Sequence, residues 1–286
     1  MKKRIELSKP QIKKIKELAN KIRKEAGVFS DAAIADDLLG YLENEGIIVC
    51  YYPFKDGERI DANITIFHTD PPIKFIGLNS NLYYDEQLFA LAHELYHYIT
   101  ESGLAYSEND MLDARIEQMA DRFAAELLLP ESVLKDRVES SFPDEKTENI
   151  SELRVLRFIA QLQIEWWLPY RSVLLRLKEE GLLPETIVGK LFNIDHRAEN
   201  SSYSRIFKNI NPEIYNLLNS KSKKIGISRN ILEIFVRNYE DGYIEEDEFV
   251  KLLSIFNKKP SDFGFDVEVI IDDDLRKILK EWENEG

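Results

Sequence analysis

The sequence contains a single cysteine and no long apolar run, and these two absences narrow the class of the protein. Cys50 has no second cysteine to pair with, so no disulfide framework is predicted. It lies in the apolar segment 47-IIVCYY-52, where a small core residue is expected rather than a reactive thiol. The basic N-terminal residues are not followed by an apolar stretch, so neither a secretion signal nor a membrane span is predicted. We therefore expect a cytoplasmic protein that does not associate with membranes.

Positive charge is also scarce, because 38 lysines and arginines stand against 52 aspartates and glutamates and give a net charge of −14. A chain this acidic binds nucleic acid poorly without specific contacts, since it must approach a polyanion. We expect no direct nucleic-acid binding and a preference for basic protein partners.

The order of the predicted elements indicates an α+β fold. Apolar residues at helical spacing predict a helix over 10–26, and a second helix is expected over 31–46. The expected elements that follow are strands over 47–52, 63–68 and 73–78, and then helices over 85–100 and 109–128. These elements form a small three-stranded sheet with its helices, followed by an all-helical C-terminal region. Seams divide the chain into a first domain (1–140), a helical region (150–193) and a helical C-terminal region with an acidic tail (204–286).

Two of the four histidines lie in 90-ALAHELYHYITESG-103, in the spacing H-E-x-x-H. On a helix, His93 and His97 lie one above the other and can bind one metal ion. Zinc lowers the pKa of water to about 7, and the adjacent Glu94 can then take its proton as the catalytic acid/base. This pattern predicts metal-assisted hydrolysis rather than two packed histidines.

A catalytic zinc site has three protein ligands, and the next helix offers the third. Glu117 follows His97 by twenty residues, and Asp121 lies on the same helical face four residues later. We expect Glu117 to bind the metal and Asp121 to hold the outer nitrogen of a ligating histidine. Zn²⁺ is the expected ion, although Mn²⁺ or another divalent ion suits these ligands as well. The competing acids are found at or before the helix start, where acids also cap helices: Glu108, Asp110 and Asp113.

The segments 73-IKFIGLNSNLYYDEQLFALAHELYHYI-99 and 117-EQMADRFAAELLLP-130 resemble the ImmA/IrrE family of metallo-endopeptidases, over about residues 10–140. The resemblance implies zincin-type active-site helices in a metallopeptidase domain over 1–140 and a degenerate helix-turn-helix over 150–193. It also implies cleavage of a helix-turn-helix transcriptional repressor, which relieves repression during stress or induction of a mobile element. Two departures from the family pattern stand out. Tyr96 takes the place of a frequent glycine, and Asp85, Glu86 and Gln87 stand where basic residues are common. Neither departure removes a ligand, and both can alter the substrate cleft or the entry to it.

Several features stay open at this level. The group that stabilises the oxyanion or binds substrate is one of His68, Tyr83, Tyr84 and Tyr106, each of which also suits a structural role. The strand over 73–78 can pair with an extended substrate. The alternatives to a repressor protease are a toxin of a toxin–antitoxin pair, and a non-cleaving module that binds a repressor and holds a structural metal.

Overall fold

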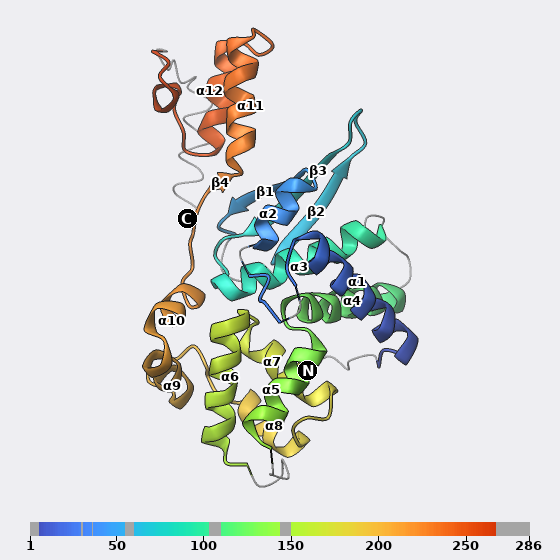
Figure 1. Cartoon of the computed structure of the whole chain (residues 1–286). Coiled ribbons are helices and arrows are strands. Elements are labelled where there is room, and N and C mark those ends of the chain that lie inside the picture. Colours follow the sequence, from blue (N-terminus) through green and yellow to red (C-terminus); the bar gives the residue numbers. More distant parts are fainter. Residues whose placement is uncertain are drawn as a thin grey trace.

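The computed structural model describes residues 6–29, 31–35, 37–54, 60–102, 110–143 and 150–266. A small sheet with its helices forms one part, helices occupy the part below it, and a helix pair projects at the far end (Figure 1). The predicted α+β class with a mainly helical C-terminal region is confirmed. None of the described helices has the length and apolar content needed to span a bilayer.

The sheet has the strand order β2-β3-β1-β4, formed by β1 (Ile47–Tyr52), β2 (Ala62–Phe67), β3 (Ile73–Asn79) and β4 (Gly226–Ile227). β1 and β3 run parallel, whereas β2 is antiparallel to β3 and β4 is antiparallel to β1. The three predicted strands are therefore present. The short β4 comes from the C-terminal half, where the sequence predicted helices only.

The position of β3 corrects one expectation. β3 lies between β1 and β2, so both of its edges are already paired, and it cannot add a substrate strand. Within the described residues, β2 pairs only with β3 and has one free edge. That edge lies beside α3 (Tyr84–Thr100), the helix that follows β3.

Helices cover the sheet and continue its core. α1 (Lys9–Glu25) packs on α4 (Asp110–Leu128), α4 packs on α3, and α2 (Asp37–Asn44) packs on β1. α2 begins six residues later than predicted. Ile76 and Leu78 of β3 and Leu91 and Leu95 of α3 are fully buried in this core. Alternation along the strand and helical spacing along α3 thus direct their apolar sides to the same interior.

The helices of the second half extend this core. They are α5 (Glu131–Ser141), α6 (Glu152–Trp166), α7 (Tyr170–Glu179), α8 (Glu185–Phe192), α9 (Ser202–Ile210) and α10 (Pro212–Leu218). A single cluster of buried side chains runs from Ile15 to Leu218. A buried ion pair joins α7 to α4, where Arg176 Nη1 lies 2.8 Å from Glu126 Oε2. α4 therefore rests on the second half of the chain.

α11 (Arg229–Glu240), α12 (Glu246–Ile255) and the 3-10 turn η2 (Pro260–Phe263) form the projecting end (Figure 1). Their own small core stacks the rings of Tyr239 and Phe249, whose centroids are 4.4 Å apart. Gly242 has a φ of +73° in the turn between the two helices, a conformation that glycine adopts without strain.

Candidate metal centre

α3 presents the H-E-x-x-H residues because its apolar stripe orients the helix. Leu88, Leu91 and Leu95 are buried against the core, and the histidines therefore lie on the side facing α4. Acidic residues in the first turn favour the helix dipole, and Glu101 ends the helix in a left-handed conformation. The predicted bounds of this helix are confirmed within one residue.

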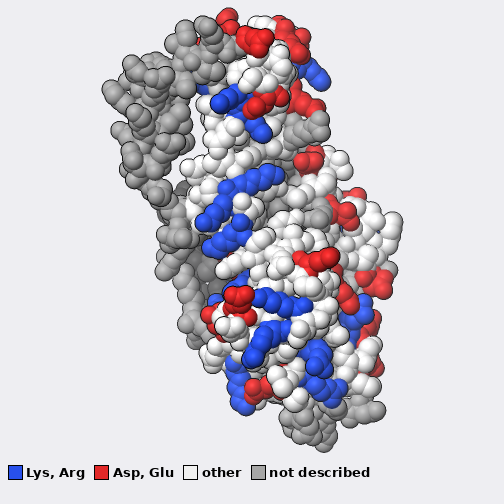
Figure 2. All heavy atoms as spheres, turned by 90° about the vertical axis from the view of Figure 1, so that its left-hand side faces the viewer, with Lys and Arg blue, Asp and Glu red and all other residues white. Residues whose placement is uncertain are grey.

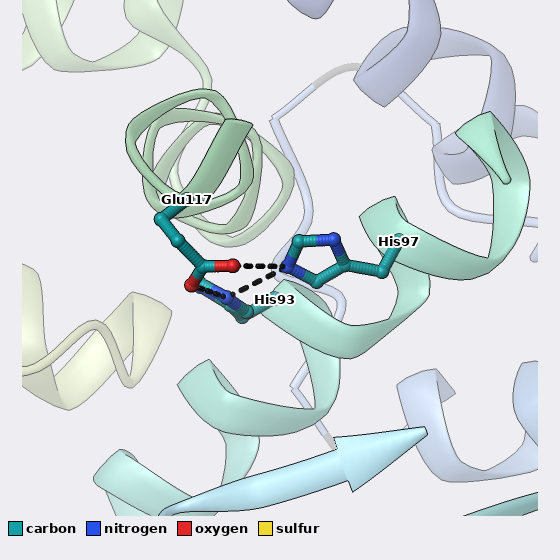
Figure 3. A group of neighbouring side chains, drawn as sticks. All are labelled: His93, His97 and Glu117. Atoms are coloured by element: carbon teal, nitrogen blue, oxygen red, sulfur yellow. Dashed lines mark hydrogen bonds and ion pairs between the residues drawn. The ribbon is translucent and has the colours of Figure 1, made fainter. Parts of the chain in front are cut away.

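α4 approaches α3 closely enough to deliver a carboxylate. Ala120 and Ala124 are fully buried in α4 and leave room for the neighbouring helix. Glu117, one turn before Ala120, extends toward the histidine rings (Figure 3). The structure therefore brings together the three predicted metal ligands His93, His97 and Glu117.

The spacing of the three groups fits a metal ion. The Nε2 atoms of His93 and His97 are 3.1 Å apart, and they lie 3.2 and 3.3 Å from the two carboxylate oxygens of Glu117. Ligand atoms about 2.0–2.1 Å from a tetrahedral zinc are separated by about 3.3 Å. The three side chains need little movement to bind such an ion.

The outer nitrogens of both rings have acceptors that set the tautomers. His93 Nδ1 donates to Asp121 Oδ1 at 3.0 Å, as predicted for Asp121, and His97 Nδ1 donates to the carbonyl of Ser102 at 3.0 Å. In the neutral rings, both Nε2 atoms then carry lone pairs directed at each other and at a carboxylate. Without a proton between them, the two Nε2 atoms and the Glu117 carboxylate repel one another, and a cation bound among them removes this repulsion.

The electrostatics of the site also favour a cation. Burial lowers the pKa of His93, but hydrogen bonds to Asp121 and Glu117 and the negative charges of Asp121 and Glu94 outweigh it and raise that pKa to about 10. Hydrogen bonds from both histidines hold the pKa of Glu117 well below its usual range. The site therefore attracts either a proton or a metal ion at neutral pH.

Glu94 is buried, with 8% of its surface exposed, and is held beside the sheet. Its Oε2 accepts a hydrogen bond from the backbone N–H of Ile64 in β2 at 2.9 Å. Burial raises the pKa of Glu94, whereas the positive charge of His93 and His97 opposes the rise. A carboxylate with a raised pKa next to a metal site can accept and return a proton near neutral pH.

The remaining predicted site residues lie elsewhere. His68 is exposed just after β2. The Tyr83 ring lies under the guanidinium of Arg197, 4.1 Å from its centroid, and the Tyr84 ring packs edge-on against Trp167. Tyr106 and Glu108 lie outside the described residues, as do the side chains of Asp110 and Asp113. The assignment of an oxyanion-stabilising group stays a prediction.

The two departures from the family pattern have structural explanations. Tyr96 is buried, and its ring lies 5.5 Å from that of Phe123 in the contact between α3 and α4. Asp85 and Gln87 are also buried, and Gln87 donates to the carbonyl of Leu82 at 2.8 Å. These three side chains are part of the interior, whereas Glu86 is only partly buried, and an effect of the departures on the substrate cleft stays a prediction.

Sequence reasoning missed two groups at this site. The Ser102 carbonyl and the Ile64 N–H belong to the backbone, so their hydrogen bonds cannot be predicted from the side chains in the sequence. It also missed Asp61, just before β2. Burial and the negative charge of Glu86 and Asp121 raise the pKa of Asp61, whereas His93 lowers it, so Asp61 lies close to these acids and to His93.

A helix with H-E-x-x-H and a glutamate from the next helix, beside the free edge of a sheet, defines a metal-dependent peptidase. The family model of the IrrE N-terminal-like domain, a peptidase family, matches residues 43–177. Residues 43–177 thus match a metallopeptidase family, in agreement with the ImmA/IrrE resemblance of the sequence. The match begins later and ends later than the resemblance in the sequence, and it includes α6 and α7. No curated protein matches the chain.

Proposed function

We propose that this protein is a zinc-dependent endopeptidase that cleaves a helix-turn-helix transcriptional repressor and so relieves repression. The observation that carries the proposal is the convergence of ligand atoms of His93, His97 and Glu117 within 4.8 Å of one another, with the buried carboxylate of Glu94 beside them. A purely structural metal would not need Glu94 next to the ligands.

His93, His97 and Glu117 would hold the ion, and Asp121 and the Ser102 carbonyl fix the two rings. A divalent ion in this position supplies Lewis acidity, which polarises a carbonyl and makes water more acidic. Because the Ile64 N–H occupies only Oε2 of Glu94, Oε1 can take a proton from the attacking water and pass it to the leaving amine.

The free edge of β2 supports cleavage within an extended chain. The Ile64 N–H is directed toward Glu94 and away from β3. Since main-chain groups alternate in direction along a strand, those of Ala62 and Ile66 also face the free edge. A peptide paired with this edge would pass the metal ligands with its backbone extended.

A basic substrate is favoured by the charges at the site. Asp61, Glu86 and Asp121 interact electrostatically beside His93, and their combined charge attracts cations. DNA-binding repressors carry basic surfaces, which is consistent with the target that the family resemblance implies.

The test is a survey of new protein N-termini by mass spectrometry, in host cells with and without the inducing stress. Wild type is compared with Glu94→Gln, which retains an oxygen to accept the Ile64 N–H. A Glu94-dependent terminus inside a helix-turn-helix regulator would support the proposal. Many such termini in essential proteins would point to a toxin instead. No Glu94-dependent terminus under any stress would refute endopeptidase activity.

A further inference from the structure

The first turn of α3 is anchored to the C-terminal half of the chain through a buried carboxylate. Asp85 is fully buried, and both of its oxygens accept hydrogen bonds. Oδ1 lies 2.6 Å from Arg197 Nη2 and 2.9 Å from the backbone N–H of Glu86. Oδ2 accepts from Gln163 Nε2 of α6 at 3.3 Å. Because every partner is a donor, the carboxylate is matched to its surroundings in the ionised form.

Arg197 joins three separate parts of the structure. It lies in the connection between α8 and α9, and its Nη2 reaches Asp85. Its Nη1 donates to the carbonyl of Leu218 at 3.3 Å and to Asn219 Oδ1 at 2.6 Å, at the end of α10. The guanidinium also covers the ring of Tyr83, the residue before α3. A planar group with five donors suits such a junction, whereas a lysine does not.

The chain that leaves this junction crosses the start of α3. We call residues 219–227 the strap. The Ser220 carbonyl accepts from the Tyr84 N–H at 3.1 Å, and the Lys223 N–H donates to the Ser80 carbonyl at 3.0 Å. The strap then ends in β4, which pairs with β1. The connection from β3 to α3 is thus held by backbone bonds to the C-terminal half.

The buried anchor differs from the exposed charges on the same face. Lysine and arginine side chains gather over the strap and α9 (Figure 2). Arg205 on α9 is exposed, and its side chain has no ion pair or hydrogen bond within the described part of the chain. Arg197, by contrast, is 14% exposed and paired with a carboxylate that is 0% exposed. Arg205 is therefore a matched reference for Arg197.

We propose that Arg197 is a positioning residue for the metal centre, which acts through Asp85 to fix the start of α3. α3 is continuous from Tyr84 to Thr100, so a displacement of its first turn is carried along the helix to His93 and His97. The strap and the helices beyond it thereby control the geometry of the ligands. The catalytic consequence rests on the proposed function, whereas the effect on metal binding does not.

The test uses the full chain with Arg197→Ala, Asp85→Asn, the double variant and Arg205→Ala. Zinc affinity is measured by competition with a chelator, and amide hydrogen exchange is followed over residues 84–100. We expect Arg197→Ala and Asp85→Asn each to weaken zinc binding by roughly three- to thirtyfold. The double variant should bind zinc no less tightly than the single variant with the lower zinc affinity, because both substitutions remove the same interaction. Arg205→Ala should match wild type.

Arg197→Lys separates positioning from loss of charge. Lysine retains the charge but has a single nitrogen, whereas the two Nη atoms of arginine bind Asp85 and Asn219 together. We therefore expect a zinc affinity between those of wild type and Arg197→Ala. If Arg197→Ala does not fold, the isosteric Asp85→Asn and Arg197→Lys decide the question. Wild-type zinc affinity and wild-type exchange in folded variants would overturn the proposal. A wild-type protein that binds zinc tightly but cleaves nothing would count against the proposed function alone. For an active enzyme, we expect kcat to fall more than KM rises.

Discussion

Replacement of Asp121 by alanine tests how strongly the ring of His93 depends on its outer hydrogen bond. Asp121 Oδ1 accepts from His93 Nδ1 at 3.0 Å, and its side chain is 42% exposed. Loss of an acceptor in this position typically weakens metal binding by about 10- to 100-fold, or about 1.4–2.7 kcal/mol. Because Asp121 is partly exposed, water can replace the lost acceptor, and we expect the lower end of this range.

Ser102→Ala is the matched control for that experiment. Ser102 Oγ lies 3.4 Å from His97 Nδ1, but the stronger acceptor of this ring is the Ser102 backbone carbonyl, which alanine retains. We expect zinc affinity within about twofold of wild type. Competition with a fluorescent zinc chelator at constant pH measures both variants. Equal affinities for wild type and Asp121→Ala would refute the role given to Asp121, and a large loss in Ser102→Ala would refute the assignment of the carbonyl.

Three further perturbations probe the site and its support. With the pKa of metal-free His93 near 10, zinc binding at pH 7 should release about one proton, seen by calorimetry in buffers of different ionisation enthalpy; no release would contradict that protonation state. Arg176→Met should lower the free energy of unfolding by about 1–3 kcal/mol, because buried Glu126 keeps only Arg122, 3.6 Å away, as an ionic partner. Adding Glu126→Gln, which keeps an oxygen to accept from the Glu131 N–H, should restore part of the loss in urea denaturation, and an additive second loss would refute the explanation. Burial, followed by the charges of Arg197 and Arg171, lowers the pKa of His196 to about 4. The unfolded chain therefore binds more protons between about pH 6.5 and 4, and stability should fall by about 1–2 kcal/mol as the pH drops through this window, after allowance for partial exposure. His196→Phe keeps the stacking on Tyr170 and should remove this dependence in thermal unfolding.

Much of the local structure could be predicted because its determinants are short-range. The three main strands and the helix pair of the metal centre were predicted within a residue or two, since apolar periodicity reports which side of each element is buried. α2 was predicted to begin too early, because the residues before Asp37 also fit a helical pattern. β4 was missed because two residues are too short to produce a strand pattern.

The sequence by itself determined the candidate ligand set of this protein. Residues four apart share a helical face in any α-helix, so His93 with His97, and Glu117 with Asp121, could be paired before the fold was known. Only the tertiary structure decided that β2 rather than β3 is the free edge, because strand order depends on contacts between distant segments. It also decided that a backbone carbonyl holds His97 and that Arg197 reaches Asp85 across 112 residues. Backbone acceptors have no sequence signature, and a buried ion pair is set by packing rather than by spacing along the chain.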